Sequence, residues 1–183
     1  MRHQNLTRRL SGRWAALFFA LALGACASSA EPERMIVTAA PATGGFPAPL
    51  SQAMCVRNVT GGEETNPMWV SKVDNTGFRT ALTGSMATSG LMAPADGCKY
   101  PVDANLLGLS QPIIGFDMEV VSHINYKVYD TAGQPVMLET INAPFTATIS
   151  DAVVGIVRIK RANEGSIRSS ISQFLDKLRA LKM

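Results

Sequence analysis

Residues 116–129 carry the pattern that most constrains the fold of this 183-residue chain. Apolar and polar side chains alternate here, and in an extended strand side chains two residues apart share a face. The apolar face would hold Phe116, Met118, Val120, Ile124, Tyr126 and Val128, and the polar face Asp117, Glu119, His123, Asn125 and Lys127. Alternation over this length predicts a long antiparallel strand with one face on a core and one in water.

More strands are predicted on either side of this one. Residues 130–133 (DTAG) are typical of a turn, and residues 136–149 continue the alternation, which predicts a long hairpin. Upstream, residues 100–109 predict a third strand, with its proline near the start, where a strand tolerates one. Residues 52–59 predict a shorter first strand that ends at Gly61 and Gly62.

Two segments have helical spacing. The first begins at a cap at Asp74 or Asn75 and stops at Gly90. The second is expected from about Asp151 to Leu181, with an apolar stripe in its second half made of Ile167, Ile171, Phe174, Leu175, Leu178 and Leu181. Residues 152–160 begin with β-branched side chains, so we expect continuous helix there with a strand as the alternative.

The element order, strand, helix, three strands and helix, predicts one α+β domain over residues 51–183. We expect an antiparallel sheet with a long hairpin packed against two helices, in a two-layer sandwich.

The first 25 residues predict an export signal. They contain four arginines and no acidic residue, and residues 14–25 form an apolar stretch of 12. As a helix this stretch is about 18 Å long, too short for a hydrocarbon core of about 30 Å. Removing the segment takes four of the 17 Lys and Arg, leaving 13 against 14 Asp and Glu. The mature chain therefore has no basic excess to support nucleic-acid binding.

The apolar stretch ends in Leu23-Gly24-Ala25-Cys26, which resembles the lipobox of bacterial lipoproteins. The resemblance implies that residues 1–25 are a lipoprotein signal peptide and that Cys26 carries the acyl chains, such as palmitate, that hold the protein on a membrane. Because Ala27 and not Asp follows the cysteine, it also implies sorting to the outer membrane, with the domain facing the periplasm. The alternatives are the inner membrane and an ordinary export signal with a chance cysteine.

Residues 26–50 predict a flexible tether, because they are rich in Ala, Ser, Thr, Gly and Pro. One short β-branched stretch, residues 35–38, would add at most an edge strand. As a coil, the tether would span about 27 Å on average.

Two cysteines, Cys55 and Cys98, remain once Cys26 is acylated. An even pair in an oxidising compartment predicts a disulfide bond. In the chain-entropy model, closing this loop stabilises the fold by roughly 4 kcal/mol. A redox-active pair is the alternative, but the sequence has no Cys-x-x-Cys motif.

His123 is the one histidine of the mature chain, on the polar face of the predicted strand with Asp117 and Glu119. These side chains would follow one another at about 7 Å per two residues. We expect a solvated strand face, with a metal site or a carboxylate acid/base pair as alternatives. We expect no metal and no cofactor.

Arg158, Lys160, Arg161 and Arg168 form a basic cluster on the predicted C-terminal helix. Helical spacing places Glu164 beside Arg161 and Arg168, which predicts surface ion pairs. Contact with anionic lipid headgroups is the functional alternative.

The domain also resembles small accessory lipoproteins of the bacterial envelope, such as the lipopolysaccharide-assembly lipoprotein and transport auxiliary lipoproteins. The resemblance follows the helix motif Phe78-x-x-Ala81-Leu82-x-x-Ser85, the hairpin and the C-terminal amphipathic helix. It implies a non-enzymatic accessory or assembly factor of an envelope complex or transport pathway, with an envelope protein or anionic lipid as partner. The contact would lie at the polar strand face with Asp117 and His123, at a free sheet edge, or at the arginine cluster. The alternative is a periplasmic carboxylate-dependent hydrolase or transferase.

Overall fold

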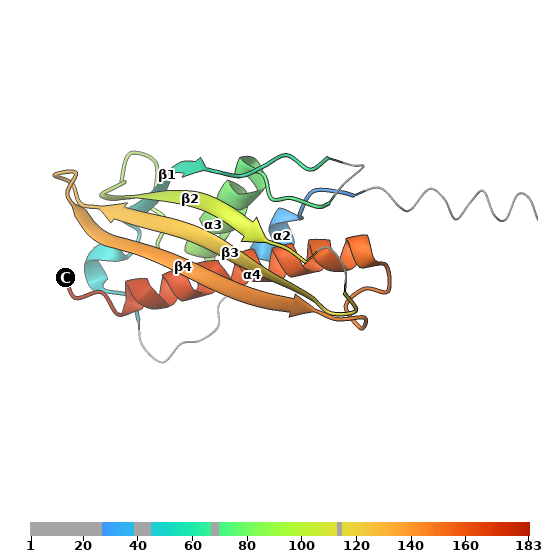
Figure 1. Cartoon of the computed structure of the whole chain (residues 1–183). Coiled ribbons are helices and arrows are strands. Elements are labelled where there is room, and N and C mark those ends of the chain that lie inside the picture. The colour runs from blue at the N-terminus through green and yellow to red at the C-terminus, as the bar shows by residue number, and fades with distance from the viewer. Residues whose placement is uncertain (1–26, 39–44, 67–69, 113–114) are drawn as a thin grey trace, which may run out of the picture.

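The computed structural model describes residues 27–38, 45–66, 70–112 and 115–183. They form a four-stranded sheet with the long helices packed against one of its faces (Figure 1). The elements in chain order are α2 (Pro32–Met35), the short 3₁₀ helix η2 (Ala48–Leu50), β1 (Met54–Thr60), α3 (Asn75–Thr88), β2 (Tyr100–Ser110), β3 (Met118–Tyr129), β4 (Pro135–Ala147) and α4 (Gly155–Arg179). The predicted two-layer α+β fold is confirmed.

Strands β3 and β4 form the long hairpin that the alternation predicts. Ile124 pairs with Ile141 near the middle of the two strands. Every second side chain of β3 from Met118 to Val128 is buried, and the residues between them are exposed or half-buried. The Asp130 carboxylate closes the turn by accepting two backbone hydrogen bonds. The period of two therefore sets both the strand and the face that it buries.

Strand β1 departs from the predicted antiparallel arrangement, because it pairs parallel to β2. The strand order is β1-β2-β3-β4, and the other two pairs are antiparallel. Helix α3 supplies the crossover connection that parallel neighbours need. As predicted, Asp74 caps this helix by accepting a hydrogen bond from the Gly77 N–H at 2.7 Å. The chain then turns at Gly90, whose φ of 71° suits a glycine.

Helix α4 begins at Gly155 and not at Asp151, so the predicted start is wrong. The Asp151 carboxylate accepts hydrogen bonds from the backbone and hydroxyl of Thr148 and closes the turn after β4. Residues 155–160 are helical, which decides against the strand alternative there, while β-branched Val153 and Val154 stay outside the helix. Within the described ranges no helix, α4 included, is long and apolar enough to cross a membrane.

The two halves of α4 pack on two separate apolar clusters. The second half of α4 packs on the main core with Ile167, Ile171, Phe174, Leu175 and Leu178, as predicted. The first half packs Ile159 and Ala162 on the end of the hairpin, against Met118, Val120 and Ala147. Between the clusters, a Cβ on Gly165 would overlap the Phe145 ring, so the glycine permits the close approach of α4 to β4.

Tyr126 lies at the centre of the main core with no exposed surface. Its ring stacks on Phe174 at a centroid distance of 4.4 Å and meets Phe78 edge-on at 6.5 Å. The buried hydroxyl lies 3.1 Å from the hydroxyl of Ser170. Burial raises the pKa of Tyr126 and keeps the phenol neutral.

Cys55 and Cys98 form the predicted disulfide bond, with their Cα atoms 5.6 Å apart. Cys55 lies in β1, and Cys98 lies just before β2. The bond therefore joins the loop that follows α3 to the first strand, at the parallel edge of the sheet.

The predicted flexible tether is wrong for its described residues, 27–38 and 45–50. Met35 and Leu50 have no exposed surface and belong to the main core. The small polar composition suggested a coil, but these two large apolar side chains bind their segments to the domain by burying surface. The folded domain therefore includes described residues before residue 51 and is not limited to residues 51–183.

Candidate functional site

Residues 27–38, which we call the N-terminal segment, run alongside α4 in the same direction. Residues about three positions apart in the segment contact successive turns of the helix. Three hydrogen bonds define this course, from Lys160 Nζ to Ser28 Oγ at 3.0 Å, from the Glu31 N–H to Glu164 Oε1 at 2.9 Å, and from Arg168 Nη1 to the Arg34 carbonyl at 3.1 Å.

Glu31 is the hub of these contacts. Its carboxylate accepts hydrogen bonds from Lys160 Nζ and Arg34 Nε, both at 2.8 Å, and lies 3.7 Å from the Arg161 guanidinium. These hydrogen bonds, from Lys160 first and Arg34 second, lower the pKa of Glu31 to about 2. The carboxylate therefore stays charged, and its ion pairs stay formed, at any pH near neutrality.

The first residues of the segment also contact the chain before α3. The Ser71 hydroxyl donates to the Ser28 carbonyl at 2.8 Å, and the Ala30 N–H donates to the Lys72 carbonyl at 3.2 Å. Ala27 and Ala30 are both buried. The chain is therefore held in place from the residue that directly follows Cys26.

The end of the segment is fixed to α3. The Val37 N–H donates to the Ser85 hydroxyl at 2.9 Å, and the Thr88 hydroxyl donates to the Val37 carbonyl at 3.0 Å. Together with buried Met35, these contacts place the segment in the groove between α3 and α4.

The side chains of the predicted basic cluster make contacts within the domain that stabilise the fold. Arg158 is buried and donates to two backbone carbonyls just before α4, at 2.7 and 3.1 Å. The predicted ion pair between Arg161 and Glu164 is present at 2.8 Å. Arg168, expected beside Glu164, instead donates to the Arg34 carbonyl and lies 5.9 Å above the Phe145 ring.

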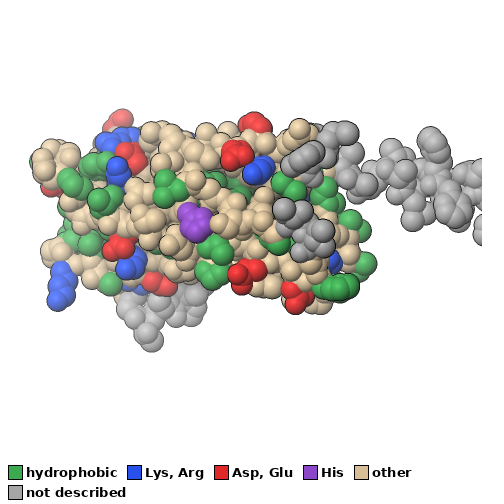
Figure 2. Space-filling view, viewed as in Figure 1, with side chains coloured by type: hydrophobic (Ala, Val, Ile, Leu, Met, Phe, Trp, Pro, Cys, Tyr) green, Lys and Arg blue, Asp and Glu red, His purple; other side chains and the backbone are tan. Residues whose placement is uncertain are grey.

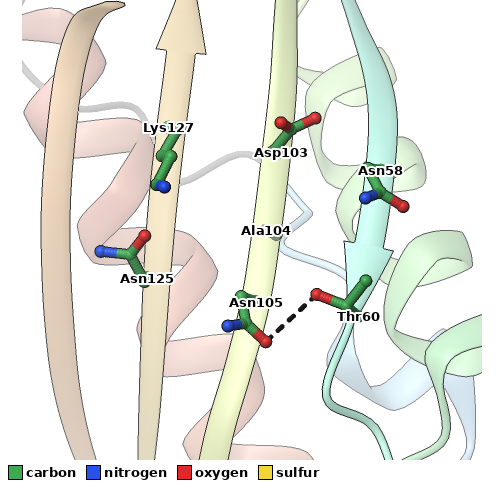
Figure 3. Close-up of a pocket in the computed structure, with 7 residues that line it drawn as sticks. All are labelled: Asn58, Thr60, Asp103, Ala104, Asn105, Asn125 and Lys127. Carbon is green, nitrogen blue, oxygen red and sulfur yellow. Dashed lines mark hydrogen bonds between the residues drawn. The ribbon is translucent and has the colours of Figure 1, made fainter.

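The sheet face opposite the helices is open and carries rows of polar side chains that cross the strands. In one row, the Thr60 hydroxyl donates to Asn105 Oδ1 at 3.1 Å, and Asn125 Nδ2 donates to the Thr140 hydroxyl at 3.0 Å. An open pocket of about 200 Å³ lies along this row and is also lined by Asn58, Asp103 and Lys127 (Figure 3). Amides and hydroxyls of this kind suit hydrogen bonding to a polar, weakly charged surface.

His123 lies in a second row and near the middle of the exposed face (Figure 2). Its Nε2 is 3.0 Å from the Ser110 hydroxyl and its Nδ1 is 2.8 Å from Asn142 Oδ1. The contact with the Asn142 amide oxygen requires Nδ1–H to donate, while the Ser110 hydroxyl can either donate to Nε2 or accept from it. The predicted polar strand face is therefore present, and the imidazole links three neighbouring strands.

The structure does not gather Asp117 and Glu119 around His123. Asp117 precedes β3 and is exposed, while Glu119 and His123 are four residues apart along β3. At about 3.4 Å per residue, the last two lie roughly 14 Å apart. Among the described residues, no three His, Cys, Asp or Glu side chains are placed to hold a metal ion.

Two features of the site were not predicted from the sequence: the docking of the N-terminal segment and the contacts of Glu31. The signal for docking was the apolar run Met35-Ile36-Val37, which a solvated tether does not need. Glu31 lies far along the chain from the basic cluster, so the sequence gave no sign of its partners. Cys26, the predicted acylation site, and residues 1–25 lie outside the described residues.

Comparison with known proteins identifies the fold. No family model and no curated protein matches this sequence. Protein XCC0632 from Xanthomonas campestris, of family DUF330, superposes with a TM-score of 0.59 at 9% identity, over 85% of this chain and 96% of its own. At that identity the likeness shows a shared α+β fold.

Two looser structural matches are lipoproteins. A putative lipoprotein from Caulobacter crescentus gives a TM-score of 0.43 at 12% identity, covering 56% of this chain and 78% of its own. A minor lipoprotein from Acinetobacter baumannii gives a TM-score of 0.43 at 12% identity, covering 71% and 92%.

Proposed function

We propose that this protein is a bacterial lipoprotein, acylated at Cys26, whose folded domain serves as a non-enzymatic accessory factor of an envelope complex or transport pathway. The motif Leu23-Gly24-Ala25-Cys26 after an apolar stretch of 12 residues carries the first part. The anchored protein belongs on the outer membrane, with its domain in the periplasm, because Ala27 follows the acylated cysteine.

The start of the folded domain supports this processing site. Ala27 is buried, and Ser28 is bound through both its hydroxyl and its carbonyl. Cleavage before Cys26 would leave a mature chain that is folded from its second residue. It would also remove the four arginines of residues 1–25.

The chemistry of the open sheet face supports the accessory role. Amides, hydroxyls and the His123 imidazole hydrogen-bond to one another there, and Asp103 and Lys127 lie on the same face. Such a surface suits a protein partner, and β4, paired on one side in the described sheet, offers an edge for an added strand.

The anchor is tested by metabolic labelling with a tagged fatty acid and by membrane fractionation. The full-length chain should incorporate label and fractionate with the outer membrane, and Cys26→Ser should lose both properties. Ser29→Ala is the matched control, since this exposed residue lies beyond the motif. Label that persists in Cys26→Ser would contradict the assignment, and label that fractionates with the inner membrane would correct the sorting.

The partner surface is tested by a photo-crosslinking amino acid placed at single sites in the anchored protein. A crosslinker at Asn125 on the open sheet face should give one product of defined mass. The same group at Gln173, exposed on α4 and away from the sheet face, is the control and should give none. Equal crosslinking from both sites would contradict a specific contact on this face.

A further inference from the structure

Three chain segments meet at one end of the molecule. Met118 at the start of β3 pairs with Ala147 at the end of β4. A Cβ on Gly155, the first residue of α4, would lie 3.9 Å from the Met118 side chain. Figure 1 shows the end of β4 and the beginning of α4 on the same side of the molecule. We call this region the hairpin end, because it is opposite the β3–β4 turn.

The N-terminal segment points toward the hairpin end. Because the segment runs parallel to α4, its earlier residues contact earlier turns of the helix, and Ser28 meets Lys160 in the second turn. Cys26 is bonded to Ala27, so their Cα atoms lie about 3.8 Å apart. Ala27, the residue to which Cys26 is bonded, therefore lies on the side of the start of α4.

The hairpin end also exposes large apolar side chains. Phe116 is 81% exposed and Val153 82% exposed. Ile149 and Val154 are about half exposed. Phe116 and Ile149 lie two residues beyond the last pair of the hairpin, and Val153 and Val154 directly precede α4. Figure 2 shows hydrophobic side chains at this end of the visible face.

We infer that the hairpin end is a membrane-contact surface, with Phe116, Ile149, Val153 and Val154 inserted among the lipids next to the acyl chains on Cys26. The partner is the phospholipid bilayer that holds the anchor. This inference rests on the proposed acylation of Cys26. A domain bound from Ala27 onward has no length of free chain to carry it away from the membrane, so the apolar end is held against the lipid.

The charges around this surface define what kind of lipid contact it makes. Asp117 and Asp151 are exposed beside the apolar side chains. Carboxylates at the rim would lie at headgroup level and repel anionic lipids. The contact is therefore apolar and does not depend on anionic headgroups, in contrast to binding through an arginine cluster.

The test uses the acylated protein in phosphatidylcholine vesicles that contain lipids with a nitroxide at the headgroup. An environment-sensitive fluorophore is attached at Val153→Cys, or at Ala132→Cys in the exposed turn at the opposite end. The nitroxide should quench the label at Val153 several-fold more than the label at Ala132. Replacing Phe116 and Val154 with serine, which changes exposed side chains and spares the core, should reduce the quenching at Val153 toward that at Ala132.

Each outcome of this experiment decides one point. Mass spectrometry of the same sample reports acylation, so an unmodified Cys26 would refute the proposed function separately. Acylated protein whose Val153 label is quenched no more than its Ala132 label would overturn the membrane-contact surface and leave the lipoprotein assignment intact. A third outcome is that the fluorescence of the Val153 label changes with protein density and not with the amount of nitroxide lipid. A second copy of the protein would then cover the patch, which also overturns the inference.

Discussion

The Glu31 carboxylate lies 2.8 Å from the Lys160 ammonium, although 129 residues separate them in the chain. The pair joins the beginning of the domain to its last helix. Since Lys160 also donates to Ser28, the same ammonium holds the chain close to the proposed anchor at Cys26. The position of the anchor relative to the domain is thus set by side chains of α4.

We predict that Glu31→Gln loosens the N-terminal segment. The substitution removes the charge that pairs with Lys160, so the free energy of unfolding should fall by up to about 1 kcal/mol. Hydrogen exchange of residues 27–38 should accelerate more than that of the sheet. Glu33→Gln, on the same short helix and exposed, is the control. Unchanged exchange in Glu31→Gln would mean that the other contacts of the segment, buried Met35 among them, hold it without this ion pair.

The same pair predicts a pH dependence. The pKa of Glu31 is about 2 in the folded protein, against an ordinary 4.5. A depressed pKa stabilises the fold above the unfolded value, and the contribution is lost as the pH falls from about 4.5 toward 2. The difference in unfolding free energy between wild type and Glu31→Gln should therefore be largest above pH 4.5 and shrink below it. Denaturation curves with the same difference at pH 3 and pH 7 would contradict this.

The sheet could be predicted from the sequence because its signal is local and repeated. The alternation from Met118 to Val128 defines β3 and its buried face without reference to the rest of the chain. Phe116, predicted on the same buried face, lies before β3 and is exposed, so the prediction is wrong for this residue. The start of α4 could not be predicted in the same way. Asp151 is a good capping residue, but it caps the turn after β4, and that choice depends on where Thr148 lies in three dimensions.

We predict that Gly165→Ala destabilises the domain, although alanine ordinarily favours a helix over glycine by up to about 1 kcal/mol. The added Cβ would overlap the Phe145 ring, and overpacking of this kind costs about 1 to 3 kcal/mol. In a Phe145→Leu background the same substitution should cost less. Chemical denaturation of the four proteins gives the coupling, and a stabilising Gly165→Ala would refute the close contact.

The disulfide bond between Cys55 and Cys98 should contribute roughly 4 kcal/mol to stability, because it restricts the unfolded chain. Adding a reductant should lower the denaturation midpoint of the wild-type protein. Cys98→Ser should start from that lower midpoint and be insensitive to reductant. Finding both thiols free in protein isolated from the periplasmic side without reductant would show that the bond does not form after export.

The contacts of the N-terminal segment could not be predicted, because they join residues far apart in sequence. The composition of residues 26–50 is that of a linker, and the apolar run that begins at Met35 was the sign against it; the position of Met35 in the main core shows that the segment is docked. The polar sheet face, in contrast, could be predicted in part. His123 lies on it as the alternation predicts, but its bonds to Ser110 and Asn142 depend on the strand register.

The most direct test of this account is the intact mass of the protein isolated from membranes. We predict a chain that begins at Cys26 and carries the added mass of two or three acyl chains on that residue. A chain that retains residues 1–25, or one cleaved in this region without any added lipid, would contradict the lipoprotein assignment on which the proposed function and the membrane-contact surface both depend.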